Sequence, residues 1–215
     1  RGAFRKDTVG LCLGAACSRY EDAEGILYRS YCALIRYILE ETPFAVADRT
    51  GIKLKKSAPV QSSGATTAQY EKTLGIPPMQ LIDGPGGMHI IGCAAAAFPV
   101  GMVLAQTWNM ELIEQIGQAY AHDMETYHVT VGLAPGMNIH RDPLCGRNFE
   151  YYSEDPYLAG KMAAAYIRGI QSQGVAACPK HFAVNSQELQ RMCVDEAVDE
   201  RTLREIFLTG FEIAV

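Results

Sequence analysis

The 215-residue sequence lacks the features that identify several common classes of protein. No run approaches the ~18 consecutive apolar residues of a membrane-spanning helix, and no block of basic residues offers the surface that nucleic-acid binding requires. Acidic and basic residues are interspersed and give a net charge of -5. We therefore expect neither a membrane nor a nucleic acid as a partner.

Motifs for metals, dinucleotides and redox chemistry are also absent. The seven cysteines form no Cys-x-x-Cys pair and the five histidines show no ligand spacing, which predicts no metal and no cofactor. The glycines at 84, 86 and 87 do not follow the Gly-x-Gly-x-x-Gly fingerprint of dinucleotide-binding folds. An odd, scattered cysteine count favours reduced, mostly buried thiols, and from it we expect a cytoplasmic protein.

The first part of the chain carries no pattern of chemical interest. Three basic residues precede the apolar run 9–17, which either loosely imitates an export signal or, being short and containing two glycines, forms a buried segment. Apolar residues at helical spacing predict a helix over residues 22–41, and residues 44–70 resemble a surface connection. We assign residues 1–60 to an N-terminal helical segment and connection, and residues 61–215 to the main domain.

The rest of the sequence repeats the order of strand, polar loop and helix. Strands are predicted over 79–82, 131–134 and 175–178, the apolar run 94–100 offers a fourth, and helices are predicted to begin at Asn109, Pro156 and Asp199. Such repetition indicates a parallel sheet, and polar groups after several strands favour a (β/α) barrel over a doubly wound sheet. Because a closed barrel needs eight strands and typically ~250 residues, we predict an α/β fold that is about the first half of a (β/α)8 TIM-type barrel.

Each predicted strand is followed by polar side chains. Asp83 comes after the first strand, Arg147 lies in the long polar loop after the second, and Lys180 and His181 follow the third. Since the carboxyl ends of parallel strands meet at one edge of a sheet, we expect these groups to share a site. Adjacent ionisable groups such as Lys180 and His181 are hard to explain by packing, because burying them without a partner is costly.

Structural explanations compete for the other residues. Asp83 can instead cap the turn that follows it, and Arg147 can pair with Glu150 or Asp155 to brace its loop. Arg191 lies in a polar stretch where it can simply be solvated.

Four motifs in order carry a family resemblance. Asp83-Gly84-Pro85, the run 132–156 with Cys145-Gly146-Arg147-Asn148-Phe149-Glu150, Lys180-His181-Phe182 and Asp199-Glu200-Arg201-Thr202-Leu203 together resemble the amino-terminal barrel of family 3 glycoside hydrolases, the β-glucosidases and their relatives. The resemblance covers about residues 74–215. It implies a retaining enzyme that removes a terminal β-linked glucosyl residue through a glycosyl-enzyme intermediate, without a metal.

The resemblance also implies which residues hold the sugar. It assigns this role to Asp83, Arg147, Lys180 and His181, with Arg191 as a further ligand. A carboxylate that accepts from vicinal hydroxyls, while Arg, Lys and His donate to others, fixes a sugar ring through charge-assisted hydrogen bonds. His89 stands where many relatives have an arginine six residues beyond the first of these residues, so this contact would be made by a shorter, titratable donor.

Neither catalytic carboxylate of the family is recognisable in the chain. Retaining hydrolysis needs two carboxyl groups about 5–5.5 Å apart, and the family's nucleophile is the Asp of a Ser/Thr-Asp-Trp motif. The single tryptophan, Trp108, directly follows Thr107, and nothing resembles the acid/base of relatives. The resemblance thus implies the sugar-binding half of a β-glucosidase site, inactive alone; a non-catalytic sugar-binding or regulatory half-barrel is the alternative. Open sheet edges predict an oligomer or association with the missing remainder of the barrel.

Overall fold

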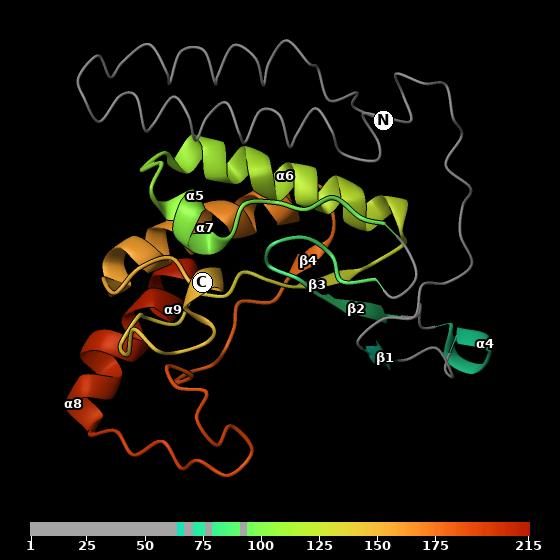
Figure 1. Cartoon of the computed structure of the whole chain (residues 1–215). Coiled ribbons are helices and arrows are strands. Elements are labelled where there is room, and N and C mark those ends of the chain that lie inside the picture. The colour runs from blue at the N-terminus through green and yellow to red at the C-terminus, as the bar shows by residue number, and fades with distance from the viewer. Residues whose placement is uncertain (1–63, 67–70, 76–78, 91–93) are drawn as a thin grey trace, which may run out of the picture.

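A computed structural model describes residues 64–66, 71–75, 79–90 and 94–215 (Figure 1). Its centre is an open sheet of four strands in the order β1-β2-β3-β4. The strands are β1 (Gly64–Thr66), β2 (Met79–Asp83), β3 (Val131–Leu133) and β4 (Ala176–Ala177). The helix predicted over residues 22–41 lies outside the described residues, and the division of the chain near residue 60 stays a prediction.

Three of the strands run parallel, as the repeated strand and helix pattern predicts. β2 pairs with β3, where Asp83 lies opposite Leu133, and β3 pairs with β4, where Gly132 lies opposite Ala177. An isolated parallel bridge between Gly136 and Lys180 continues the pairing beyond β4. The chain therefore leaves all three strands at the same edge of the sheet.

Strand β1, the one antiparallel member of the described sheet, falls in a segment that we assigned from the sequence to a surface connection. β1 pairs antiparallel with β2, with Ala65 opposite Gln80. A three-residue strand carries too little periodicity to be read from sequence, and only its partner makes it a strand.

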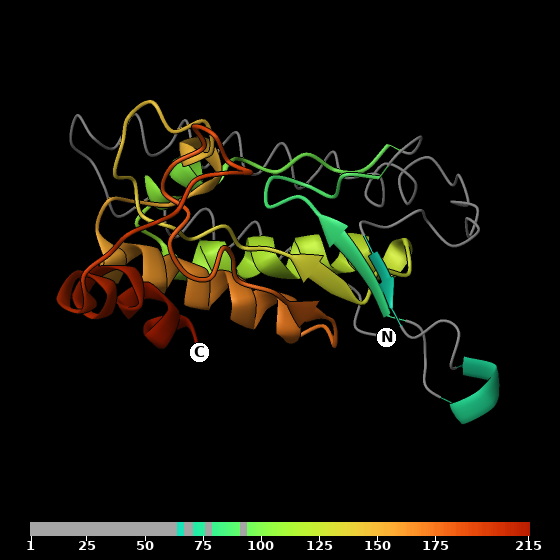
Figure 2. The same ribbon diagram turned by 90° about the horizontal axis from the view of Figure 1, so that it is seen from below.

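Two long helices cover the sheet. They are α6 (Met110–Thr126) and α7 (Pro156–Gln171). Each begins at a capping side chain: Asn109, as predicted, accepts from the Leu112 amide at 3.0 Å, and Asp155 accepts from the Tyr157 amide at 2.9 Å. Figures 1 and 2 show the two helices side by side.

The helices approach each other through glycine. A Cβ added at Gly117 would lie 2.4 Å from the carbonyl oxygen of Tyr166, and one added at Gly169 would lie 2.1 Å from that of Glu114. Side chains are excluded from this crossing, which brings the two backbones into contact.

The core lies between these helices and the sheet. Its largest fully buried members include Ile82 of β2, Ile113, Ile116, Tyr120 and Met124 of α6, and Met162, Tyr166 and Ile170 of α7. These are the apolar positions that repeat at helical spacing in the sequence, which explains why both helices could be predicted.

The strand predicted over 94–100 is wrong. Residues 94–100 join no ladder; the amide of Phe98 donates to the Gly86 carbonyl at 2.8 Å, and α5 (Gly101–Ala105) begins immediately after Val100. An apolar run broken by Pro99 offers too few amide donors for a ladder.

The last predicted helix is present but irregular. Asp199 accepts from the Thr202 amide at 3.0 Å and starts α8 (Glu200–Thr202), which continues through a π-helical turn, η3 (Leu203–Phe207), into α9 (Thr209–Ala214). The remaining short helices are α4 (Glu71–Leu74) and η2 (Asn148–Glu150). None of the helices in the described part of the chain has the length and apolar content to cross a membrane.

Candidate functional site

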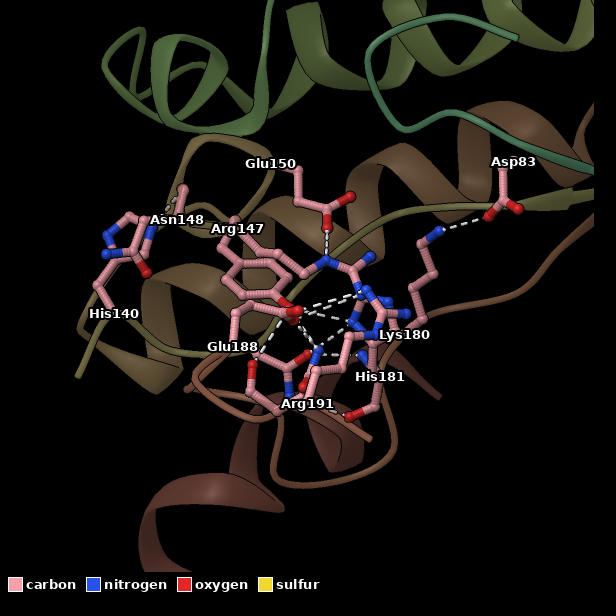
Figure 3. Close-up of polar contacts among 12 residues, drawn as sticks. Asp83, His140, Arg147, Asn148, Glu150, Lys180, His181, Glu188 and Arg191 are labelled. Atoms are coloured by element: carbon pink, nitrogen blue, oxygen red, sulfur yellow. Dashed lines mark hydrogen bonds and ion pairs between the residues drawn. The ribbon is translucent and has the colours of Figure 1, made fainter. Parts of the chain in front are cut away.

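The carboxyl ends of the parallel strands bring Asp83 and Lys180 together. Asp83 is the last residue of β2, and Lys180 lies just past β4, where its backbone is fixed by bonds to Pro135 and Met137 of the loop after β3. The Lys180 Nζ atom donates to Asp83 Oδ1 at 2.9 Å (Figure 3). The lysine side chain is 14% exposed and the aspartate side chain 49%, so the pair reaches the surface mainly through the aspartate.

Arg147 occupies the loop between β3 and α7, and its first partner is within that loop. Its Nε atom donates to Glu150 Oε1 at 2.5 Å, and the glutamate side chain is only 6% exposed. Burial acts to lower the pKa of Arg147, but the hydrogen bond and negative charge of Glu150, together with the smaller effects of Tyr151 and Glu188, outweigh burial and the net shift is upward. The sequence alternative that paired Arg147 with Glu150 is confirmed, whereas Asp155 caps α7 instead.

Glu188 links the two arginines, and nothing in the sequence pattern indicated it. One carboxylate oxygen lies 3.8 Å from Arg147 Nη1, and the other accepts from Arg191 Nη1 at 3.3 Å. Asn185 also donates to Glu188 at 3.3 Å. Arg191, 60% exposed, therefore joins the cluster through an ion pair on its outer side.

His181 is held by a set of neutral polar groups. Its Nδ1 atom lies 3.1 Å from the Tyr151 hydroxyl and 3.2 Å from Asn138 Oδ1, and its backbone amide donates to the same Oδ1 at 2.6 Å. Desolvation, together with the positive charges of Arg147, Lys180 and Arg191, lowers the pKa of His181 to about 3. The imidazole is therefore neutral at physiological pH. Tyr151 and Asn138 are site residues that the sequence analysis missed, because they read as ordinary core and loop positions.

His89 is the one predicted residue whose side chain does not join this group. Its backbone amide donates to the Asp83 carbonyl at 2.8 Å, while its side chain is exposed and, within the described residues, forms no hydrogen bond or ion pair with the other five predicted residues. No group of three potential metal ligands occurs in the described ranges.

The assembled cluster suits recognition of a neutral polyhydroxylated ligand. Three cations, Arg147, Lys180 and Arg191, are matched by the carboxylates of Asp83, Glu150 and Glu188, so donors and acceptors stand in fixed positions with little net charge (Figure 3). A hydroxyl can donate to Asp83 and accept from Lys180 at the same time, which is the requirement for holding a sugar ring.

Comparison with known proteins gives consistent matches. Residues 49–215 match the sequence profile of the glycosyl hydrolase family 3 N terminal domain. Thermostable beta-glucosidase B of Acetivibrio thermocellus is 50% identical over 153 residues, covering 66% of this chain and 20% of the relative. Exo-alpha-(1->6)-L-arabinopyranosidase of Bifidobacterium longum is 41% identical over 186 residues, covering 80% of this chain and 24% of the relative.

Solved structures agree with these sequence matches. Beta-glucosidase 3B from Thermotoga neapolitana, in complex with alpha-D-glucose, has a TM-score of 0.61 and 55% identity, covering 65% of this chain and 21% of that structure. A beta-glucosidase from Paenibacillus barengoltzii has a TM-score of 0.69 and 41% identity over 74% of this chain. The chain spans 18% to 20% of the length of the first two curated relatives.

Proposed function

The chain belongs to glycosyl hydrolase family 3, whose N-terminal domain profile its residues 49–215 match, and from this we propose that it supplies the sugar-binding half of a retaining β-glucosidase. The intact enzyme would hydrolyse terminal β-linked glucosyl residues by double displacement. Its two catalytic carboxylates would lie in other parts of the enzyme, and the 215-residue chain alone would not turn over.

One observation carries the proposal. Asp83 lies 97 residues before the adjacent pair Lys180 and His181, yet all three lie where the parallel strands end, and Lys180 bonds to Asp83 directly. In barrel enzymes this edge is where substrate binds. The structure of Thermotoga neapolitana beta-glucosidase 3B, 55% identical over its matched region, is a complex with glucose, which supports a glucosyl unit as the ligand.

The open sheet supports a half-barrel that other strands complete. Among the described strands, β4 is paired on one side only, by β3. An unpaired edge is a template for a further strand. We propose that the rest of the barrel pairs with this edge, either in the same polypeptide or in an associated one.

Calorimetry of the 215-residue chain tests sugar binding. D-glucose should bind saturably, and Lys180→Gln should weaken binding about 10- to 150-fold, because a charge-assisted hydrogen bond contributes ~1.5–3 kcal/mol. Lys161→Gln is the matched control, since Lys161 lies on α7 against the Tyr157 ring, in no contact with the Asp83–Lys180 pair. If the folded chain binds no pyranose, or if both variants bind alike, the assignment of the site fails.

Activity assays test whether hydrolysis needs the rest of the barrel and which sugar is the substrate. The chain alone should leave an aryl β-glucoside intact, and mixing it with the remainder of the barrel should restore hydrolysis. The match with the arabinopyranosidase of Bifidobacterium longum covers 80% of this chain, so an aryl α-L-arabinopyranoside belongs in the same assay. If the restored enzyme hydrolyses it faster than the β-glucoside, the proposed substrate becomes an arabinopyranoside in place of a glucoside. Sugar binding without hydrolysis, by the chain alone and by the mixture, would favour the non-catalytic alternative.

A further inference from the structure

The side chain of His181 is surrounded by groups whose hydrogen-bonding roles can be assigned. Asn138, 2% exposed, donates through Nδ2 to the carbonyls of His181 and Ala183 at 2.9 and 3.0 Å. Carbonyl oxygens can only accept, and the His181 amide on the other side can only donate, so the orientation of the Asn138 amide is fixed. Its Oδ1 atom is therefore an acceptor that faces His181 Nδ1 at 3.2 Å.

The contacts of the Tyr151 hydroxyl fit the same assignment. It receives a hydrogen bond from the side-chain Nδ2 of Asn185 at 3.1 Å, and it can donate its own proton to the backbone carbonyl of Asn185 at 3.2 Å. Asn185 Nδ2 is identified as the amide nitrogen because it also contacts the Glu188 carboxylate. When its single proton goes to that carbonyl, the hydroxyl oxygen offers a lone pair to His181 Nδ1 at 3.1 Å, which matches the acceptor role that Asn138 Oδ1 already fixes.

From these contacts we infer that Asn138 and Tyr151 are positioning residues that hold His181 as the neutral tautomer with its proton on Nδ1. The opposite tautomer would set the Nδ1 lone pair against Asn138 Oδ1 and leave the Asn185 carbonyl without the tyrosine proton. Burial and three nearby cations disfavour the doubly protonated form.

The consequence concerns specificity. With the proton on Nδ1, the Nε2 atom is a hydrogen-bond acceptor, and it has no partner of its own in the described part of the chain. From the sequence we expect His181 to donate alongside arginine and lysine. Instead, His181 accepts from a sugar hydroxyl while the adjacent Lys180 donates, so the pair requires a hydroxyl that can give its proton. This step rests on the proposed function, whereas the tautomer does not.

Nitrogen NMR of the histidine-labelled 215-residue chain tests the tautomer without any ligand. At neutral pH, two-bond proton–nitrogen spectra should show Nδ1 protonated and Nε2 unprotonated for the imidazole whose signals vanish in His181→Gln. Tyr151→Phe should raise the ratio of the Nε2-protonated to the Nδ1-protonated form about 2- to 10-fold, the effect of one neutral hydrogen bond. Tyr166→Phe is the control, because the buried Tyr166 hydroxyl has no hydrogen-bond partner within the described residues.

Two results would overturn the inference: a proton on Nε2 in the wild-type spectrum, or a tautomer ratio that Tyr151→Phe leaves unchanged. Titration with glucose and with its monodeoxyfluoro analogues extends the test to the ligand, since fluorine cannot donate. One analogue should bind at least tenfold more weakly than glucose to the wild-type chain, and His181→Gln, which can donate in place of accepting, should reduce that difference. Absence of all sugar binding would refute the proposed function and leave the tautomer result standing.

Discussion

Replacing Arg147 by methionine separates the structural role of this residue from its role in binding. The substitution leaves Glu150, 6% exposed, without its cation. Two charges about 4 Å apart at an effective dielectric constant of ~20 interact by about 4 kcal/mol, and removing one partner of a buried pair costs about 3–5 kcal/mol. Because Arg147 itself is 16% exposed, we expect the lower end, a loss of about 3 kcal/mol in the free energy of unfolding.

The double variant Arg147→Met, Glu150→Met completes the cycle. Removing both charges should restore the free energy of unfolding to within about 1 kcal/mol of wild type, since an apolar pair of similar volume avoids the desolvation cost. Urea denaturation followed by circular dichroism measures all the variants. Arg168→Met is the matched control: its pair with Glu114 spans 3.2 Å but is 57% and 37% exposed, and should contribute less than about 1 kcal/mol.

Two results would contradict a buried structural pair. One is an Arg147→Met protein as stable as Arg168→Met, and the other is a double variant that loses as much free energy of unfolding as Arg147→Met alone. The expected result also bears on binding assays. In an Arg147→Ala chain, loss of the proposed sugar contact and loss of the brace of the loop would both weaken binding, so Lys180 is the better probe of the site.

Two further predictions concern stability. Gly169→Ala should cost about 1–3 kcal/mol, measured as a lower Tm by calorimetry, because its Cβ would lie 2.1 Å from the Glu114 carbonyl oxygen; Gly146→Ala, with nothing within 4 Å of the added Cβ, should be neutral, and equal effects would contradict the close helix crossing. Burial raises the pKa of Asp123 from 3.8 to about 6, so the fold loses stability as the pH rises from about 4 to about 6, where the carboxyl is ionised in the unfolded chain but still protonated in the folded one. Asp123→Asn, which keeps an acceptor for the Ala96 amide at 3.2 Å, should therefore gain about 2–3 kcal/mol in urea unfolding at pH 7 and little at pH 4; a gain independent of pH would exclude this cause.

Part of the fold could be predicted because it is encoded locally. Helices α6 and α7 carry their apolar stripe and their capping residues within a few positions of each other, and β2 ends at an acid followed by glycines. Strand β1 could not be found, since its three residues become a strand only by pairing with β2. The apolar run 94–100 was mistaken for a strand because hydrophobicity alone does not show whether the amides of a segment reach a neighbouring strand.

The sequence by itself determined the order of the three parallel strands and of helices α6 and α7, the family, and the placing of Asp83, Arg147, Lys180 and His181 after strands. Each of these depends on residue types at short spacing, which a linear pattern records. The expected cytoplasmic location and the sugar-binding roles stay predictions.

Only the tertiary structure decided how these residues are held. Glu188 reaches Arg147 from about forty residues away, and Tyr151 reaches His181 from thirty. Such contacts depend on the backbone path of two long loops over the sheet edge, and no periodicity encodes that path. The distinction between a histidine that donates and one that accepts lies entirely in those contacts, because the side chain has the same composition in either tautomer.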